Sequence, residues 1–384
     1  MNKNSNAVYA IKLMSCVLNK SAPVAPESEI DWYSFRGFCE RHCISNIVAY
    51  GINALDLQLP DDIKAYFNEV VYQSLAKEAR LEVEISELTE SFEKNKIPHM
   101  LLKGSVIKNY YPQPDMRSMC DVDILVGNNL NEAMSITCSH GFQLKARDNL
   151  HDCYFKKPFI NLELHSSLFD EELTDLYSYF KIGFERANLL EDCKYRYTLL
   201  KEDFYIFMLA HFAKHFKRTG VGIRSVADVY VFLKNNPSID FGYIEEETEK
   251  IGLLKFAQRI QNIAISWFDE GIVNTDDSVQ EYIISSGAYG STMNLELNRF
   301  LQNKNNRENY TVKKLKYYIN VILPDFKYMC ARYPQLEKRR YLLPFYWIKR
   351  IFYTFIKSKG SISYRLGRVS KSDKSYLDKF SDFD

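Results

Sequence analysis

Apolar residues recur at helical spacing in three segments near the start of the chain: 5–20, 31–57 and 62–94. A proline-containing loop separates the first two segments, and Asp31 or Glu29 after it suits the start of a helix. The third segment is rich in helix formers and stops just before Pro98, where the backbone is biased away from helix. Residues 1–78 are therefore expected to form a helical N-terminal segment.

A strand pattern follows, with short apolar runs bounded by turn residues. The expected strands are 99–103, 121–126 and two runs within 154–168. Residues 131–141 instead favour a helix that ends at Gly141, and Lys157-Pro158 joins the last two strand runs. These elements predict an α+β domain over residues 79–200, in which helices flank a mixed sheet.

Helical spacing returns after residue 200, most clearly at 203–216 and 223–235. This pattern predicts an all-α domain over residues 201–302. The polar stretch 302–309 is the expected linker to a basic helical tail, residues 303–384.

Composition and charge add one asymmetry to this picture. A chain of 384 residues with 46% hydrophobic and 26% charged residues suits two or three globular domains and excludes a disordered or fibrous class. The net charge of +1 conceals a basic tail, because residues 311–374 hold sixteen Lys and Arg against three acidic residues.

The cysteine pattern and the N-terminus predict a cytoplasmic protein. Eight cysteines are scattered without framework spacing, which is typical of free thiols in a reducing compartment. The first residues lack the unbroken apolar core of a signal peptide, and no run is long enough for a transmembrane segment.

Three acidic residues are candidates for metal binding. Asp121 and Asp123 are two apart on an expected strand, so their side chains leave the same face. Two carboxylates that close repel each other, a cost that a bound cation removes. A D-x-D pair alone is a weak signal, but Gly104-Ser105 upstream can hold phosphate, and Glu163 lies in a later strand.

These residues resemble the minimal nucleotidyltransferase, or polymerase-beta-like, superfamily. The nearer resemblance is to a bacterial family of uncharacterised nucleotidyltransferases, carried by LLKGSVIKNYYPQPDMRSMCDVDILV and by LELH at 162–165. A weaker likeness extends over most of 31–235. The fifteen residues between Ser105 and Asp121 exceed the usual gap of the superfamily, and Cys120 stands where Ser is common. The resemblance implies a nucleotidyltransferase-like mixed sheet.

The activity that the resemblance implies is transfer of a nucleoside monophosphate from an NTP to an acceptor, with release of pyrophosphate. Asp121, Asp123 and Glu163 would bind two Mg²⁺ ions, for which Mn²⁺ can substitute. Glu163 would also take the acceptor proton. The acceptor is open: a small molecule, a protein side chain or an RNA end.

The resemblance also implies residues that bind the nucleotide. Gly104 and Ser105 would hold the outgoing phosphates. Lys103 and Arg117 would neutralise phosphate charge, unless they are only a solvated Lys at a strand end and a loop Arg.

Two further helices carry groups that either line the nucleotide or acceptor pocket or tie the helices together. His211, Lys214 and His215 share one helical face, and Arg224 and Asp228 repeat that spacing on the next helix; Phe212 excludes the zinc peptidase pattern. His165 shares the strand face of Glu163, so it is expected either to support the site or to pack.

The tail segment 341–360 mixes aromatic and basic residues. Packing within the protein is favoured over contact with a membrane surface or with nucleic acid.

Two alternative functions stay open for the whole chain. The first is that of a catalytically silent nucleotide-binding or toxin–antitoxin-type interaction protein of the same fold. An RNA-modifying transferase fits the tail but not the near-neutral whole.

Overall fold

The computed structural model describes residues 5–148, 150–290, 319, 322–326, 329–330, 333–336 and 339–357. Most of them, within 5–214 and 221–289, form one unit; residues 215–220 and the described residues from 290 onward belong to a second. The expected linker 302–309 lies outside the described residues, as does much of the expected tail. No helix in the described part of the chain is both long and apolar enough to cross a membrane.

The predicted N-terminal helices are present, with one break. They are α1 (Ser5–Leu18), α2 (Trp32–His42), α3 (Ser45–Asn53) and α4 (Asp61–Lys94). Asp31 caps α2, since its side chain accepts hydrogen bonds from the N–H groups of Tyr33 and Ser34. The expected helix over 31–57 is divided because Cys43 adopts a left-handed conformation, φ 53°, and ends α2.

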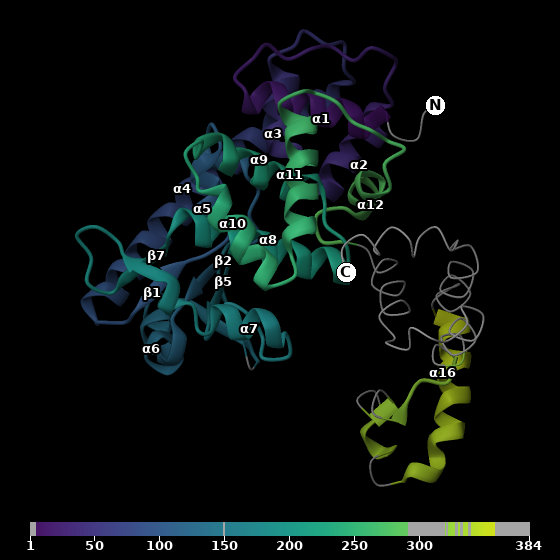
Figure 1. Ribbon diagram of the computed structural model, residues 1–384. Helices are drawn as coiled ribbons and strands as arrows, with labels where there is room; N and C mark the ends of the chain where they lie inside the picture. Colours follow the sequence, from purple (N-terminus) through teal and green to yellow (C-terminus); the bar gives the residue numbers. More distant parts are fainter. Residues whose placement is uncertain are drawn as a thin grey trace. The chain divides into compact units, whose positions relative to one another are not determined.

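The centre of the first unit is a seven-stranded mixed sheet (Figure 1). Its strands are β1 (His99–Leu101), β2 (Asp121–Leu125), β3 (Gln143–Arg147), β4 (His151–Lys156), β5 (Ile160–His165), β6 (Ala187–Leu189) and β7 (Arg196–Leu199). The order is β3-β4-β5-β2-β1-β7-β6, with parallel pairs β2–β5 and β1–β7 and antiparallel pairs elsewhere. This sheet and its helices confirm the predicted α+β class.

Three strands were not predicted. Every residue of β3 is exposed, so this strand lacks the apolar alternation that marks a strand in sequence. Strands β6 and β7 are only 3 and 4 residues long and lie at the other edge of the sheet. Hydrogen bonding to a neighbouring strand, not apolar patterning, defines all three.

Short helices connect the strands. They are α5 (Gly104–Ile107), η1 (Lys108–Tyr110), η2 (Pro114–Met116), η3 (Gly127–Asn129), α6 (Leu130–Ser139), α7 (Thr174–Phe180) and η4 (Phe184–Arg186). The predicted helix 131–141 is α6, and it ends two residues before Gly141.

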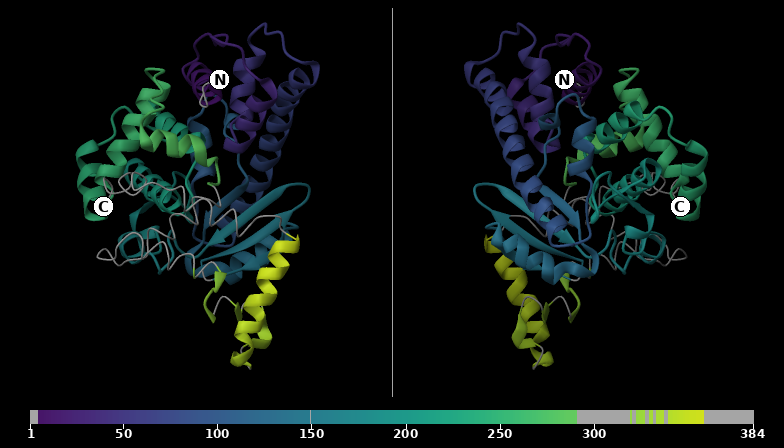
Figure 2. Two further views of the ribbon diagram at one scale, coloured as in Figure 1. Left: turned by 90° about the vertical axis from the view of Figure 1, so that its right-hand side faces the viewer. Right: turned by 90° about the vertical axis from the view of Figure 1, so that its left-hand side faces the viewer.

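One face of the sheet forms the hydrophobic core with α4 and α6. Val122 and Ile124 of β2, and Leu162 and Leu164 of β5, point to this face and are at most 2% exposed. The second half of α4 and the inner side of α6 cover them, and Figure 2 shows α4 running from the N-terminal helices down to the sheet. The expected boundary between residues 78 and 79 falls within α4. Residues that alternate with these point to the opposite face.

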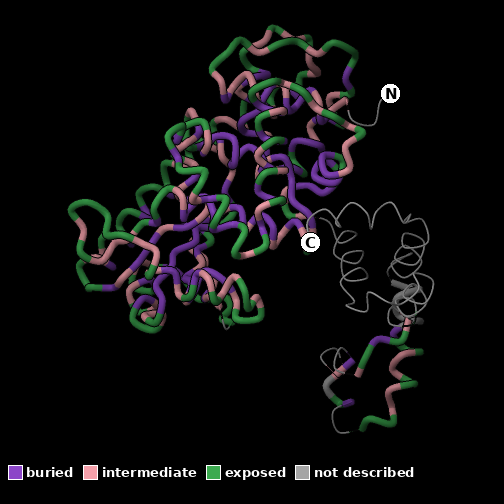
Figure 3. Tube along the Cα trace, viewed as in Figure 1, coloured by how far each residue is buried: buried purple, intermediate pink, exposed green. Residues whose placement is uncertain are grey.

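The chain is helical again after residue 200, and α11 of this region packs against α1. The helices of the region are α8 (Lys201–Arg218), α9 (Ile223–Asn235), α10 (Phe241–Lys250), α11 (Leu254–Phe268) and α12 (Ser278–Ser286). At the end of α11 the carbonyl of Phe268 accepts hydrogen bonds from Ser15 Oγ at 2.7 Å and Asn19 Nδ2 at 2.6 Å. Figure 3 shows buried residues on both helical regions. Segments distant in the sequence therefore share one core.

His42 links α2 to two of these later helices. Its Nδ1 accepts a hydrogen bond from the N–H of Ile223 at 3.2 Å, and its Nε2 donates to the carbonyl of Ile284 at 2.9 Å. This arrangement requires a neutral ring. Burial, followed by the charge of Arg41, lowers the pKa of His42 from 6.5 to about 4.

We expect this histidine to make stability depend on pH. A lowered pKa means that its contribution is complete above pH 6.5 and is lost as the pH falls toward 4, by about 2 kcal/mol at pH 5. Urea unfolding at pH 7.5 and pH 5 measures the difference. In His42→Gln that difference should shrink by about the same 2 kcal/mol, although the variant is less stable at both pH values. An unchanged difference would show that His42 does not titrate in this range.

The second unit contains the described part of the expected tail. Its elements are η5 (Pro334–Leu336), η6 (Arg340–Leu342) and α16 (Leu343–Lys357). Trp347 Nε1 donates to the carbonyl of Pro324 at 2.9 Å, which shows packing within the unit. Phe345 and Ile348 of the same helix are 62% and 56% exposed.

Candidate active site

Two parallel strands bring the predicted carboxylates to one face of the sheet. Asp123 on β2 is the register partner of Glu163 on β5, so their side chains leave the sheet in the same direction. Asp121 is two residues earlier and shares this face. Ligand atoms of Asp123, Glu163 and His165 all lie within 4.8 Å of one another. The face opposite the hydrophobic core therefore carries a concentrated group of acidic and imidazole side chains.

Asp123 is the buried member of the group, at 4% exposure. Its Oδ1 accepts hydrogen bonds from Lys103 Nζ at 2.7 Å and from His165 Nε2 at 2.8 Å. Burial opposes ionisation, but the charge of Lys103 and the hydrogen bond from His165 outweigh it and hold the pKa of Asp123 well below its usual value. Asp123 is thus a carboxylate that the protein itself keeps ionised.

The pKa of Asp121 is shifted in the opposite direction, although this residue is only two positions from Asp123. Surrounding protein desolvates its carboxylate, and the negative charges of Asp123 and Glu163 add to this effect, so the pKa of Asp121 is raised. Lys103 and Arg224 oppose the shift without cancelling it. The site therefore holds negative charge that its own cations do not fully compensate.

The Gly104-Ser105 turn lies close to Asp123, because the residue before it, Lys103, donates a hydrogen bond to that carboxylate. Lys103 has φ 47°, a conformation that is strained for a residue other than glycine, and from there its side chain reaches Asp123. A Cβ at position 104 would overlap the guanidinium of Arg117, so a larger residue there would displace that side chain. Ser105 is 6% exposed, and its Oγ finds no hydrogen-bond partner among the described residues. A buried hydroxyl in this state suits a ligand oxygen.

Arg117 and Asp228 form an ion pair behind this turn. Nε and Nη2 of Arg117 donate to the two carboxylate oxygens of Asp228 at 2.9 and 2.8 Å, and the Tyr111 hydroxyl donates to the same carboxylate at 2.8 Å. The Arg117 and Asp228 side chains are 11% and 10% exposed. The pair connects the loop before β2 to α9 and supports the turn from within the protein.

Arg224 lies near the carboxylates, at the start of α9. Its Nη1 donates to the carbonyl of Ser118 at 2.9 Å, and its guanidinium carbon is 5.7 Å from the centre of the Tyr289 ring. Tyr289 is 58% exposed, and its hydroxyl contacts the Cys120 thiol. This tyrosine is not among the predicted site residues, because it is 168 residues from Asp121 in a segment without a motif.

The residues of the predicted basic face lie on α8. His211, Lys214 and His215 are half-buried, whereas Phe212 and Phe216 between and after them are buried. The ring of His211 is 6.3 Å from that of Phe207. Participation of these three side chains in a nucleotide or acceptor pocket stays a prediction.

Two further side chains on the active face were not predicted. His151 and Cys153 of β4 lie beside β5, where Cys153 is the register partner of Glu163 and His151 is that of His165. The rings of His151 and His165 stack with centres 5.1 Å apart. Burial and then the charge of Glu163 raise the pKa of Cys153. The period-two spacing of His151 and Cys153 in a strand was the available signal.

Comparison with known proteins gives one match. The model of a family described as uncharacterised nucleotidyltransferase matches residues 28–269, which cover β1 to β7 and the helices from α2 to α11. No curated protein and no solved structure matches the chain. Because the match spans more than half of the 384 residues and contains every carboxylate of the site, the chain belongs to this family of uncharacterised nucleotidyltransferases.

Proposed function

We propose that this protein transfers a nucleoside monophosphate from an NTP to an acceptor in a Mg²⁺-dependent reaction, with release of pyrophosphate. The observation that carries the proposal is that Asp121, Asp123 and Glu163 share one sheet face beside the Gly104-Ser105 turn, where the charges of Asp123 and Glu163 act on Asp121. Membership of the nucleotidyltransferase family supports transfer of a nucleotidyl group. The two-metal chemistry is our inference from the donor set.

The donor set fits Mg²⁺. The three carboxylates offer the hard oxygen ligands that Mg²⁺ and Mn²⁺ prefer, and the raised pKa of Asp121, caused by desolvation and by its acidic neighbours, indicates negative charge that a cation would neutralise. We assign Asp121 and Asp123 to two Mg²⁺ ions and Glu163 to one of them. When bound, such ions polarise the α-phosphate and activate the acceptor oxygen.

The side chains of the turn would bind the triphosphate. Ser105 Oγ would donate to a phosphate oxygen, which supplies the partner that the hydroxyl lacks among the described residues. Lys103 is bound to Asp123, and on NTP binding its ammonium would turn to the phosphate charge. Arg224 provides a second cation next to Asp121, and Glu163 would accept the acceptor proton. We place Arg117 and Asp228 behind the turn, as its support.

Ser105→Ala tests the phosphate role of the turn. We expect the affinity for Mg²⁺–NTP to fall roughly tenfold, because one hydrogen bond to a charged group is lost, while the free energy of unfolding stays the same or rises. Calorimetric titration and urea unfolding measure the two effects. Ser286→Ala is the matched control, because it removes a buried hydroxyl that donates to the backbone carbonyl of Tyr282 at 2.6 Å. In this variant the free energy of unfolding should fall and the affinity for Mg²⁺–NTP should not. A large loss of stability in Ser105→Ala would assign the hydroxyl to the fold.

The proposed reaction is tested with NTPs labelled at the α-phosphate. Each of the four NTPs is incubated with the protein, Mg²⁺ and a cell extract, and label is sought in small molecules, protein and RNA. We expect transfer that stops with EDTA and is absent when the label is at the γ-phosphate, since pyrophosphate leaves. Equal, metal-independent NTP affinities in wild type and Asp123→Asn would contradict the proposal and favour a silent nucleotide-binding protein.

A further inference from the structure

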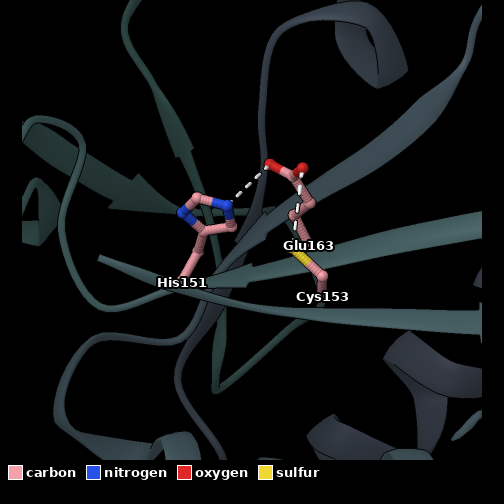
Figure 4. A group of neighbouring side chains, drawn as sticks. All are labelled: His151, Cys153 and Glu163. Carbon is pink, nitrogen blue, oxygen red and sulfur yellow. Dashed lines mark hydrogen bonds and ion pairs between the residues drawn. The ribbon is translucent and has the colours of Figure 1, made fainter. Parts of the chain in front are cut away.

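Three side chains of different chemistry meet at the edge of the candidate active site. His151 and Cys153 come from β4 and Glu163 from β5, and all three leave the sheet on the same face because Cys153 and Glu163 are register partners (Figure 4). The site assigned to Mg²⁺ uses Glu163 but not the imidazole or the thiol. This face therefore holds a second possible donor set, with one nitrogen, one sulfur and a carboxylate.

The distances suit one small metal ion. His151 Nε2 is 3.7 Å from Glu163 Oε2, and Cys153 Sγ is 4.0 Å from Glu163 Oε1. Ligand atoms of all three residues lie within 4.8 Å of one another. Around a tetrahedral zinc ion with bonds of about 2.0–2.3 Å, ligand atoms are about 3.3–3.8 Å apart. Small side-chain rotations would bring the three donors to that spacing without a change in the strands.

The neighbourhood also resembles the surroundings of a metal-binding histidine. The other ring nitrogen, Nδ1 of His151, is 3.3 Å from Oδ1 of Asp148, an ion-pair distance without hydrogen-bond geometry. A carboxylate on the far nitrogen commonly orients an imidazole that binds a metal through its near nitrogen. His151, Cys153 and Glu163 are each partly exposed, so an ion can enter from solvent. The negative charge of Glu163 next to Cys153 favours a divalent cation.

We propose that His151, Cys153 and Glu163 bind a thiophilic divalent transition-metal ion of the zinc class, with the fourth position open. Sulfur and imidazole donors select such an ion over Mg²⁺, which prefers oxygen ligands. Glu163 belongs to both groups of ligands, so its two oxygens can connect this ion to the carboxylates at Asp123. The ion site stands on its own donor set and does not depend on nucleotidyl transfer.

Cobalt substitution tests the site with a signal that reports sulfur coordination. The full chain is stripped with a chelator, reduced, and titrated with Co²⁺ while the thiolate-to-cobalt charge-transfer band is recorded. We expect a band that saturates at one Co²⁺ per chain and is displaced by Zn²⁺. Cys153→Ser should abolish the band. His151→Gln should weaken Co²⁺ binding at least tenfold, because losing a direct ligand costs at least as much affinity as losing a residue that only supports a ligand.

Two controls separate this site from other thiols and from the Mg²⁺ carboxylates. Cys138→Ser removes an exposed thiol on α6 and should leave the titration unchanged. Asp121→Asn should lose nucleotidyl transfer and keep the cobalt band, so failure of one proposal is distinguishable from failure of the other. The proposal is overturned if wild type shows no band, or if the band persists in Cys153→Ser. Circular dichroism confirms that each variant is folded.

Discussion

Asp123→Asn is expected to reduce nucleotidyl transfer at least about 100-fold, because the amide keeps the size of the side chain and removes the charge that holds Mg²⁺. Mg²⁺-dependent NTP binding should weaken in the same variant. Transfer of label from the α-phosphate measures the first effect, and calorimetric titration with and without Mg²⁺ measures the second. Transfer at the wild-type rate would remove Asp123 from the reaction.

The same substitution should also destabilise the protein. Repulsion between two carboxylates, considered alone, predicts that either Asp→Asn change leaves stability unchanged or raises it. The structure restricts this expectation to Asp121, whose pKa is raised by desolvation and by its acidic neighbours. Asp123 instead pairs with Lys103 and His165, and its loss would leave a largely buried ammonium without the carboxylate to which it donates, at a cost of about 3 kcal/mol.

Asp121→Asn is therefore the matched control for this prediction. Both variants should lose transfer, but in urea unfolding without metal only Asp123→Asn should unfold at lower denaturant concentration. Equal stabilities of the two variants would show that Lys103 and His165 do not hold Asp123 in solution.

Asp228→Asn is expected to lower the free energy of unfolding by about 3–5 kcal/mol. The reason is that Arg117 keeps its charge inside the protein and loses its counter-charge, with an amide NH2 group in place of one accepting oxygen, while the Tyr111 hydroxyl loses its anionic acceptor. Because Arg117 packs against Gly104, the NTP affinity should fall as well. Urea unfolding and calorimetric titration measure the two effects.

The exposed pair Arg36–Glu40 provides the control for burial. Its side chains are 38% and 46% exposed, and the pair lies along one helix with N to O at 2.9 Å. Glu40→Gln should change the free energy of unfolding by no more than about 0.5 kcal/mol. If Asp228→Asn cost as little as this surface variant, Arg117 would find another partner and the turn would not depend on the pair.

Local pattern was sufficient for the elements that carry a strong signal. Helical spacing located α1, α4, α8 and α9, and alternation of acidic and apolar residues located β2. It was insufficient for β3, because an edge strand whose residues are all exposed has no apolar face to reveal it. It also missed the break after α2, which depends on the backbone conformation of the single residue Cys43.

The sequence by itself determined the fold class, the family resemblance and the candidate carboxylates, because strand periodicity and the Gly-Ser and D-x-D motifs are local properties. Only the tertiary structure decided how these groups act on one another. The parallel pairing of β2 with β5 places Glu163 beside Asp123, and the pairing of β4 with β5 adds His151 and Cys153. Register between strands depends on the packing of the whole sheet against α4 and α6, which no short segment encodes. Charge followed the same rule, because two aspartates of one strand acquire opposite pKa shifts from their surroundings. Desolvation and the charges of Asp123 and Glu163 raise the pKa of Asp121, whereas Lys103 and His165 lower that of Asp123.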